Sequence, residues 1–381
     1  ISPKYIIITS FLVTVILSVS TGTSWGAAGT VGAALISVAA GMGAPLPAVA
    51  GAIVAGAYFG DKMSPLSDST NMSAIATETN LYQHIGHMFY TTVPGFIVSC
   101  VVYFIAGAHF ASDSQVGQVD EIINTLGELF NLAMPVGLLL LIPCVIVIAG
   151  SLMKKPTIPV MIISSAVAIV LAMLVQGFSF TDCAASMVKM EMLHTSMDLE
   201  NIVEQVPNLL QRGGMSSMMN TALMAFCGFS FIGALTVCGS MELILERIMK
   251  HIHGTGQLIT LTVILGVIMI TVIGEATVTF LMIGGMFRPE YIKRGLESKN
   301  LSRSLEDSIT VVEPLVPWSL AGVYMTSVLG VPTVQYAPWA VLCYTGVIFA
   351  IIWGFTGFGI AKIKKGSAAY EEYLELSGKT E

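Results

Sequence analysis

The sequence predicts an all-α polytopic membrane protein with two inverted-topology repeats, each containing a re-entrant helical hairpin and a broken transmembrane helix. Of its 381 residues, 54% are hydrophobic and 11% charged, whereas soluble domains carry roughly 25% charged residues. Apolar runs long enough to cross, or nearly cross, a ~30 Å hydrocarbon core recur along the chain. Several short runs also meet in pairs at polar, glycine-rich interruptions.

The apolar runs predict the helices, and the interruptions between them predict a site. The runs lie at 5–20, 24–41, 46–60, 87–109, 129–152, 157–177, 218–240, 257–273, 276–287, 309–330 and 337–361. The interruptions are "STGTSWG" (20–26), "GDKMSPLSDSTN" (60–71), "GEAT" (274–277) and "EPLVPWS" (313–319). Irregular backbone is tolerated at membrane depth where it lines a polar cavity, and such breaks are typical of transporter binding sites.

The interruptions occur twice in the same order, which predicts an internal repeat. Gly22 aligns with Gly274, and "SPLSD" aligns with "EPLVP", at offsets near 250 residues. Pro65, Pro314 and Pro317 are expected to keep the helices broken. The expected organisation is a first repeat at 1–109 (hairpin 5–41, broken helix 46–80, span 87–109), connecting spans and an external acidic loop at 110–217, a second repeat at 218–361 (hairpin 257–287, broken helix 305–330) and a cytoplasmic tail at 362–381.

Loop charges predict that the two repeats are inverted. Lysine and arginine favour the cytoplasmic side of a membrane, so the basic segments 288–303 and 362–365 are expected inside. The connections 110–127 and 178–217 carry an excess of acids and are expected outside. These assignments agree if 20–26 and 274–277 are tips of re-entrant hairpins that open to opposite sides. Lys4 is the one charge that fits poorly.

Ionisable side chains in or near the interruptions are the strongest sign of a site. Such a group at the centre of a spanning helix costs roughly 2.5–3.5 kcal/mol, and five acids lie there: Asp61, Asp68, Glu275, Asp307 and Glu313. A purely structural alternative pairs Lys62 with Asp61 at a helix end and uses the serines at 64, 67 and 69 as caps. Capping alone does not require two acids and a proline inside a membrane.

The same residues suit a small cation, because carboxylate, hydroxyl and amide oxygens are hard ligands. A buried carboxylate can also exchange a proton for a cation near neutral pH. We therefore expect Asp61 and Asp68 to bind cation and proton, with Na⁺ held at Asp61, Asp68 and Asn71. The further candidates are Ser64, Ser69 and Thr70 at the first break, Thr21, Thr23 and Ser24 at the first hairpin tip, and Glu275, Thr277, Asp307 and Glu313 in the second repeat.

Several stretches carry a resemblance to a known family. "STGTSWGAAGTVGAAL", "GAIVAGAYFGDKMSPLSDSTNMSA" and "HIGHMFYTTVPGF" resemble the NhaC family of sodium/proton antiporters, and "SLEDSITVVEPLVPWSLAGVYMTSVLGV" agrees more loosely. The resemblance covers nearly the whole chain and implies secondary active exchange of Na⁺ for H⁺ across the cell membrane. Some relatives resemble malate/lactate antiporters or carriers of amino acids such as tyrosine, so a Na⁺/H⁺-coupled carrier of an organic substrate is the alternative. Family members carry helices ahead of the position of Ile1, so we expect the chain to lack its N-terminal helices.

Other function classes find little support in the sequence. The formal charge of -7 argues against a nucleic-acid partner. No glycine-rich phosphate loop, Ser-His-Asp arrangement or zinc signature appears, so we expect neither an enzyme nor a cofactor beyond the transported Na⁺ and H⁺. A membrane enzyme would turn over a substrate without a gradient, and a channel would conduct without proton coupling. The expected partners are the lipid bilayer, Na⁺ and H⁺, with a small organic anion or amino acid in the alternative; the oligomeric state stays open between monomer and homodimer.

Overall fold

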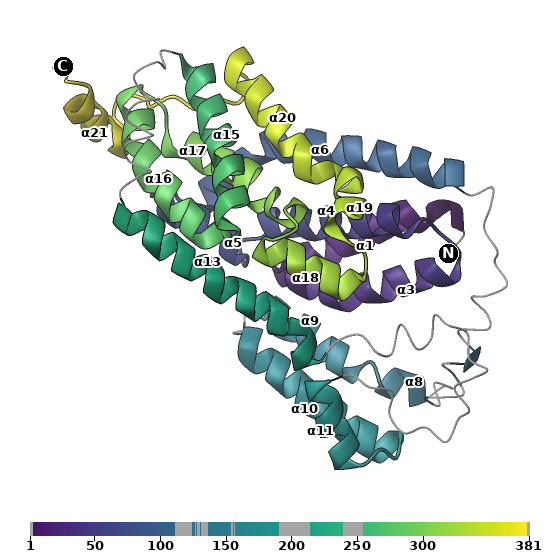
Figure 1. Cartoon of the computed structure of the whole chain (residues 1–381). Helices are drawn as coiled ribbons and strands as arrows, with labels where there is room; N and C mark the ends of the chain where they lie inside the picture. The colour runs from purple at the N-terminus through teal and green to yellow at the C-terminus, as the bar shows by residue number, and fades with distance from the viewer. Residues whose placement is uncertain are drawn as a thin grey trace.

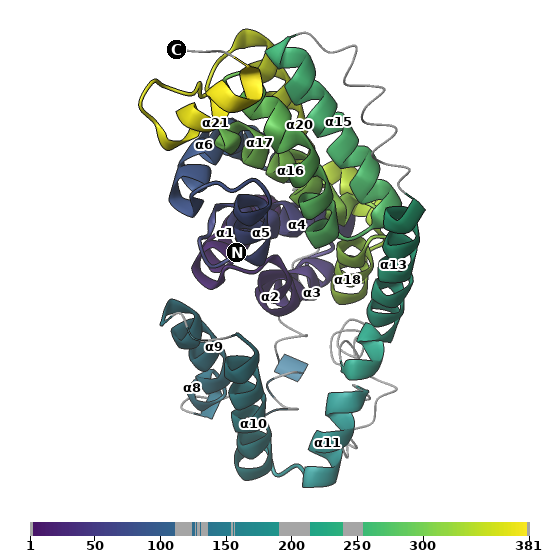
Figure 2. The ribbon, with the colours of Figure 1, turned by 90° about the vertical axis from the view of Figure 1, so that its left-hand side faces the viewer.

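The computed structural model describes residues 3–110, 124–125, 127, 130, 136–153, 155, 157–189, 214–238 and 254–378. In these ranges the regular elements are helices, and an isolated bridge joins Leu296 to Lys362. The N-terminal and C-terminal helices pack into one body (Figure 1), while α8 to α11 lie to one side of it in both views (Figure 2). The connections 110–127 and 178–217, on which part of the predicted orientation rests, lie largely outside the described residues.

The chain begins with a helical hairpin. After the short turn η1 (Pro3–Tyr5), α1 (Ile6–Thr21) ends at Gly22, whose φ of 71° is left-handed. Thr23 then caps the returning helix by accepting a hydrogen bond from the Gly26 N–H. That helix runs through α2 (Ser24–Ala27), the π-helical turn η2 (Ala28–Gly32) and α3 (Ala33–Gly41). The polar interruption at 20–26 is therefore the tip of a hairpin.

The first broken helix follows, and it packs closely along α1. In α4 (Leu46–Met63), a Cβ at Gly56 would lie 2.5 Å from the Phe11 carbonyl oxygen, so glycine is what allows the two backbones to approach. The helix stops at Ser64, and α5 (Asp68–Ala76) starts after Ser67. Pro65 lies in the gap, as expected for a residue that cannot continue a helix. The long helix α6 (Leu81–Phe110) comes next.

The C-terminal half repeats this order of elements. Helix α15 (Thr255–Ile273) ends at Gly274 (φ 75°), Glu275 caps α16 (Ala276–Lys293), and α17 (Ser298–Leu305) follows. The π-helical turn η5 (Glu306–Thr310) and the short turn η6 (Glu313–Leu315) lead to a second break, which holds Pro314 and Pro317. Helix α18 (Leu320–Leu329) starts after Ser319. The remaining helices are α19 (Thr333–Tyr336), η7 (Ala337–Trp339), α20 (Val341–Thr356) and α21 (Ala368–Ser377).

Several described helices suit a membrane. Ser24–Gly41, Leu81–Phe110 and Thr255–Ile273 are long and apolar enough to cross one, and Thr333–Trp339 with Val341–Thr356 would form a further span bent by 56°. On α6, one face buries Gly95, Ser99 and Tyr103, while the other exposes Ile97, Val101, Phe104 and Ile105. An apolar face of this extent is costly in water and suits lipid. The prediction of an all-α polytopic membrane protein is confirmed.

The middle of the chain contributes further apolar helices. The described ones are α8 (Val136–Leu139), α9 (Ile142–Leu152), α10 (Thr157–Val175), α11 (Phe180–Val188), η4 (Met215–Met218) and α13 (Met219–Cys238). Helices α8, α9, α10 and α13 lie within the predicted runs at 129–152, 157–177 and 218–240, whereas α11 and most of η4 lie in the predicted connection 178–217. The proposed division into repeats and connecting spans stays a prediction.

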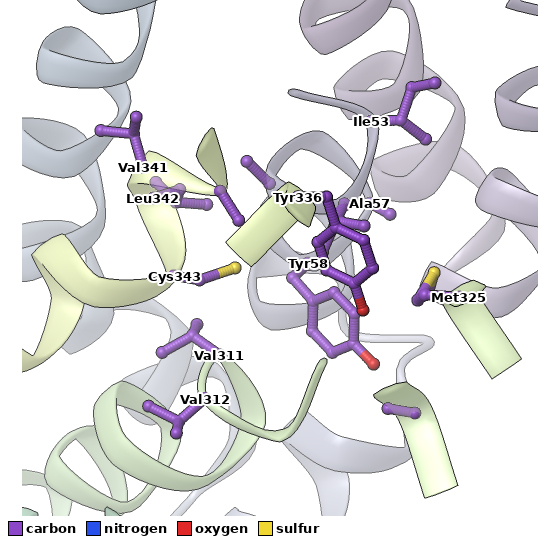
Figure 3. Packing of buried hydrophobic residues seen from close by; sticks show 14 of the residues in the cluster. Ile53, Ala57, Tyr58, Val311, Val312, Met325, Tyr336, Val341, Leu342 and Cys343 are labelled. Carbon is purple, nitrogen blue, oxygen red and sulfur yellow. The ribbon is translucent and has the colours of Figure 1, made fainter. Parts of the chain in front are cut away.

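The core lies where the two halves meet. Figure 3 shows Tyr58 of α4 next to Tyr336, with Val311 and Val312 on one side and Ile53, Ala57 and Met325 on the other. All are at most 9% exposed. This packing fixes the last turn of α4 against the second break, and so it positions the polar groups described next.

Candidate ion-binding site

A cavity of about 370 Å³ lies where both hairpin tips and both helix breaks converge. Its lining includes Thr23, Ser24 and Trp25 from the first tip, Tyr58, Asp61, Asp68 and Ser69 from the first broken helix, Glu275, Ala276, Thr277 and Phe280 from the second tip, and Thr310, Glu313 and Leu320 from the second broken helix. Four carboxylates line it, and no lysine, arginine or histidine is among these residues. The cavity therefore carries negative charge and favours cations.

Asp61 is the best-coordinated carboxylate of the cavity. It is 5% exposed, and it accepts hydrogen bonds from the Ser24 hydroxyl (2.8 Å) and the Ser67 hydroxyl (2.6 Å). Ser24 comes from the hairpin tip and Ser67 from the helix break, so one carboxylate ties the two interruptions together. Each hydroxyl donates its hydrogen bond to Asp61, and the lone pairs of its oxygen remain available to coordinate a cation.

Local sequence explains why the break holds this shape. Ser67 caps α5, and Thr70 donates to the carbonyl oxygens of Asp61 (2.9 Å) and Lys62 (3.1 Å), which α4 leaves without helical partners. The Asn71 amide donates to the carbonyl oxygens of Pro65 (3.1 Å) and Ser67 (2.6 Å). Thr70 and Asn71 thus hold the backbone of the break.

The second half also supplies two acids to the cavity lining, Glu275 and Glu313. Glu275 caps α16 by accepting from the backbone N–H groups of Thr277 (3.0 Å) and Val278 (2.9 Å). Glu313 is 8% exposed and lies beside the backbone N–H of Ala321, near the start of α18. The hydroxyls of Tyr58 and Thr310 also reach the cavity lining, where Tyr58 lies beside Ser24 and Thr310 beside Glu306. Buried polar groups of this kind indicate room for water or a ligand.

The two halves correspond at one fixed step. A separation of 252 residues relates Gly22 to Gly274, Asp61 to Glu313 and Ser67 to Ser319. The glycines share a left-handed conformation, with φ of 71° and 75°, and the serines each cap the helix that resumes after the break. This register differs by three residues from the predicted match of "SPLSD" with "EPLVP". The sequence comparison had paired Pro65 with Pro314, whereas the caps pair Pro65 with Pro317.

The structure brings together eight of the thirteen predicted site residues. Those lining the cavity are Thr23, Ser24, Asp61, Asp68, Ser69, Glu275, Thr277 and Glu313. The others that were predicted lie outside the lining: Thr21, Ser64, Thr70, Asn71 and Asp307. Thr21 donates to the Leu17 carbonyl oxygen (2.9 Å) within α1, and Ser64 accepts from the Leu66 N–H (3.3 Å).

The structural alternative for Lys62 is wrong. Lys62 forms an ion pair with Asp307 of η5, and both side chains are buried. This pair joins the two halves of the chain beside the cavity. Sequence reasoning also missed Glu306, which is fully buried next to Asp307, and the lining residues Tyr58 and Thr310. The sequence signal for Glu306 was the pair of adjacent acids in "LEDSIT", which stands among apolar residues.

These groups suit an alkali cation better than a transition metal. In the described residues, no three His, Cys, Asp or Glu side chains stand close enough to share a metal ion. Any ligand set must therefore draw on hydroxyl and carbonyl oxygens as well as carboxylates, which are the donors that hard cations prefer. With about 30 Å³ per liquid water, the cavity also has room for hydrated ions.

Comparison with known proteins also supports a cation transporter. Residues 56–358 match the Na⁺/H⁺ antiporter family. The chain is 46% identical over 370 residues to an uncharacterised Na⁺/H⁺ antiporter of Haemophilus influenzae, covering 96% of this chain and 77% of that protein. It is 32% identical over 362 residues to the Na⁺/H⁺ antiporter NhaC of Alkalihalophilus pseudofirmus (95% and 76% covered), and 31% identical over 374 residues to a malate-2H⁺/Na⁺-lactate antiporter of Bacillus subtilis (98% and 78% covered). No solved structure matches the chain. The chain belongs to the Na⁺/H⁺ antiporter family.

Proposed function

We propose that this protein exchanges Na⁺ for H⁺ across the cell membrane through the cavity between its two halves. The observation that carries the proposal is the Asp61 carboxylate, buried and bound by hydroxyls from two different interruptions. Na⁺ would bind at Asp61 with the oxygens of Ser24 and Ser67, and Asp68 and Ser69 would complete the path to it. Membership of the antiporter family supports the same exchange.

The proposed architecture is a pair of inverted repeats with re-entrant hairpins. We name residues 6–76 the N-terminal unit and residues 255–329 the C-terminal unit. Each contains a hairpin turned at a left-handed glycine and a helix broken at prolines, and the 252-residue step supports their common origin. Loop charges support opposite orientations. Inverted units of this kind let a central site open to each side in turn.

An organic co-substrate is the second candidate, and the Bacillus subtilis malate-lactate relative is what favours it. An organic anion in the cavity would face four carboxylates without a cationic side chain among the lining residues. Carboxylate substrates are usually held by arginine or lysine. We therefore favour bare Na⁺/H⁺ exchange, with the bilayer as the protein's surroundings and no further cofactor.

Proteoliposomes test the two candidates directly. Vesicles that contain the purified protein and a pH-sensitive dye receive a proton gradient, and then external Na⁺ without an organic solute. Dye recovery that saturates with Na⁺ is the expected result. Recovery that appears only after malate, lactate or tyrosine is added would instead establish the organic-solute carrier. Silence under all conditions would contradict both candidates.

A further inference from the structure

Glu306 is a buried carboxylate outside the cavity lining. It is fully buried at the start of η5, and the Thr310 hydroxyl one turn later interacts with its carboxyl group. An ionised carboxylate that is cut off from water costs far more than ordinary packing can offset, and such a group takes up a proton instead. The resting form of Glu306 is therefore the neutral acid.

Charged groups of both signs surround Glu306. The positive charge of Lys62 on α4 is close enough to interact with Glu306, but the Lys62 ammonium is already paired with Asp307. Asp61 on α4 and Asp307 itself add negative charge nearby. Arg303, one turn earlier on α17, interacts electrostatically with Asp307, and its guanidinium donates a hydrogen bond to the Gly359 carbonyl oxygen (2.8 Å). Cys343 on α20 and His84 on α6 face Lys62.

Glu306 and Asp307 belong to the C-terminal unit alone. The 252-residue step places them opposite Val54 and Ala55 of α4, which are buried apolar residues. The two acids also open the π-helical turn, and π-turns within α-helices are frequent at functional sites. A structural role shared by both units would not require acids in only one of them.

We propose that Glu306 carries the transported proton while the Asp61 cluster carries Na⁺, an inference that rests on the proposed Na⁺/H⁺ exchange. When Na⁺ enters beside Asp61, its charge favours ionisation of Glu306. The Glu306 O–H bond breaks, the electron pair stays on the carboxylate, and the proton passes by way of the Thr310 hydroxyl, which lines the cavity, to a water molecule there. Asp61 with protonated Glu306 and Asp61–Na⁺ with ionised Glu306 carry the same net charge, so one-for-one exchange adds no charge to the buried region. Na⁺ binding and proton release are then reciprocally coupled.

Glu306→Gln tests this division of labour, because glutamine keeps the shape of the neutral acid and has no proton to release. In proteoliposomes, we expect Na⁺-driven proton flux to fall about a hundredfold, the scale on which proton-transfer groups act. Exchange of radioactive Na⁺ for unlabelled Na⁺ should persist. Glu297→Gln is the matched control: Glu297 precedes the same helix and pairs with Lys299 (2.5 Å). Both fluxes should persist in that control.

The outcomes separate this inference from the proposed function. Normal proton flux in Glu306→Gln would overturn the inference and return the proton to Asp61. Loss of both fluxes in a folded variant would also overturn it, because Glu306 would then be needed for Na⁺ binding. Absent flux in the wild-type protein would instead contradict the proposed function. As a second measurement, infrared spectra of the wild type should show a protonated carboxyl band that is absent in Glu306→Gln and that saturating Na⁺ removes; persistence of this assigned band with Na⁺ would overturn the inference.

Discussion

The N-terminal unit (6–76) and the C-terminal unit (255–329) have the same turns but use their polar groups differently. In the N-terminal unit, the cap serine Ser67 donates its hydroxyl proton to a carboxylate, that of Asp61. In the C-terminal unit, Ser319 donates to the backbone carbonyl oxygen of Glu313 (2.6 Å), not to its side chain. The backbone geometry is shared, whereas the carboxylate chemistry is not. This difference indicates a cation site built mainly by the N-terminal unit.

The largest expected effect distinguishes the two equivalent acids. Asp61→Asn should abolish Na⁺-dependent proton movement, because it removes the charge that Ser24 and Ser67 surround. Glu313→Gln should leave exchange measurable, with Na⁺ affinity lowered about tenfold or less, since Ser319 donates to the Glu313 backbone and the carboxylate then acts only through space, at on the order of 1 kcal/mol. The measurement is the initial rate of dye recovery at several Na⁺ concentrations.

Two results would overturn this ranking of the acids. Exchange at the wild-type rate in Asp61→Asn would remove Asp61 from the site. Complete loss in Glu313→Gln, in protein that remains monodisperse in detergent, would make the two units equal partners. Asp68→Asn belongs to the same series, and we expect it also to abolish exchange, since Asp68 is the second cavity-lining carboxylate of the N-terminal unit.

The next largest expected effect concerns the Lys62–Asp307 ion pair, which joins the two units. Lys62→Met leaves Asp307 buried without its partner, and breaking a buried ion pair typically costs 3–5 kcal/mol. The double variant Lys62→Met/Asp307→Leu should recover most of that stability, because it removes both charges at once. Thermal unfolding of the single and double variants in detergent measures the difference. A double variant no more stable than Lys62→Met would show that the pair is not an isolated electrostatic unit.

The sequence predicts the interruptions because polar residues and glycines are conspicuous among apolar runs. The hairpin tips at Gly22 and Gly274 and the breaks at Pro65 and Pro317 all depend on local backbone chemistry, which neighbouring residues determine. The partner of Lys62 could not be predicted, because Asp307 lies 245 residues away and only the packing of the two units brings them together. The match by sequence and the match by caps differ by three residues for a related reason: proline identity is visible in the sequence, and the residue that caps a helix is seen only in the structure.

A further comparison concerns the two left-handed glycines. A Cβ at Gly22 would lie 2.5 Å from the Leu66 Cβ, whereas at Gly274 the nearest atom, the Ser319 Cα, would be 3.3 Å away. In both alanine variants the left-handed conformation lowers the free energy of unfolding by roughly 1–2 kcal/mol, and in Gly22→Ala overpacking lowers it by about a further 1–3 kcal/mol. Gly22→Ala should therefore unfold at the lower temperature. Equal melting temperatures would show that the first tip yields to the added methyl group.

The smallest effect separates capping from ion binding at equivalent serines. Ser319 accepts from the Gly322 N–H at 2.9 Å, while the corresponding distance from Thr70 N to the Ser67 hydroxyl is 3.5 Å. Ser319→Ala should cost about 1 kcal/mol of stability through the lost cap and leave Na⁺ affinity unchanged. Ser67→Ala should also cost stability, but it should in addition bind Na⁺ about tenfold more weakly, because it removes an oxygen proposed as a Na⁺ ligand and a factor of ten corresponds to about 1.4 kcal/mol. Melting temperature and Na⁺ titration of each variant give both quantities. The reverse pattern, in which Ser319→Ala weakens Na⁺ binding and Ser67→Ala does not, would place the cation in the C-terminal unit, because a serine lowers Na⁺ affinity only if its hydroxyl contributes to the ion site.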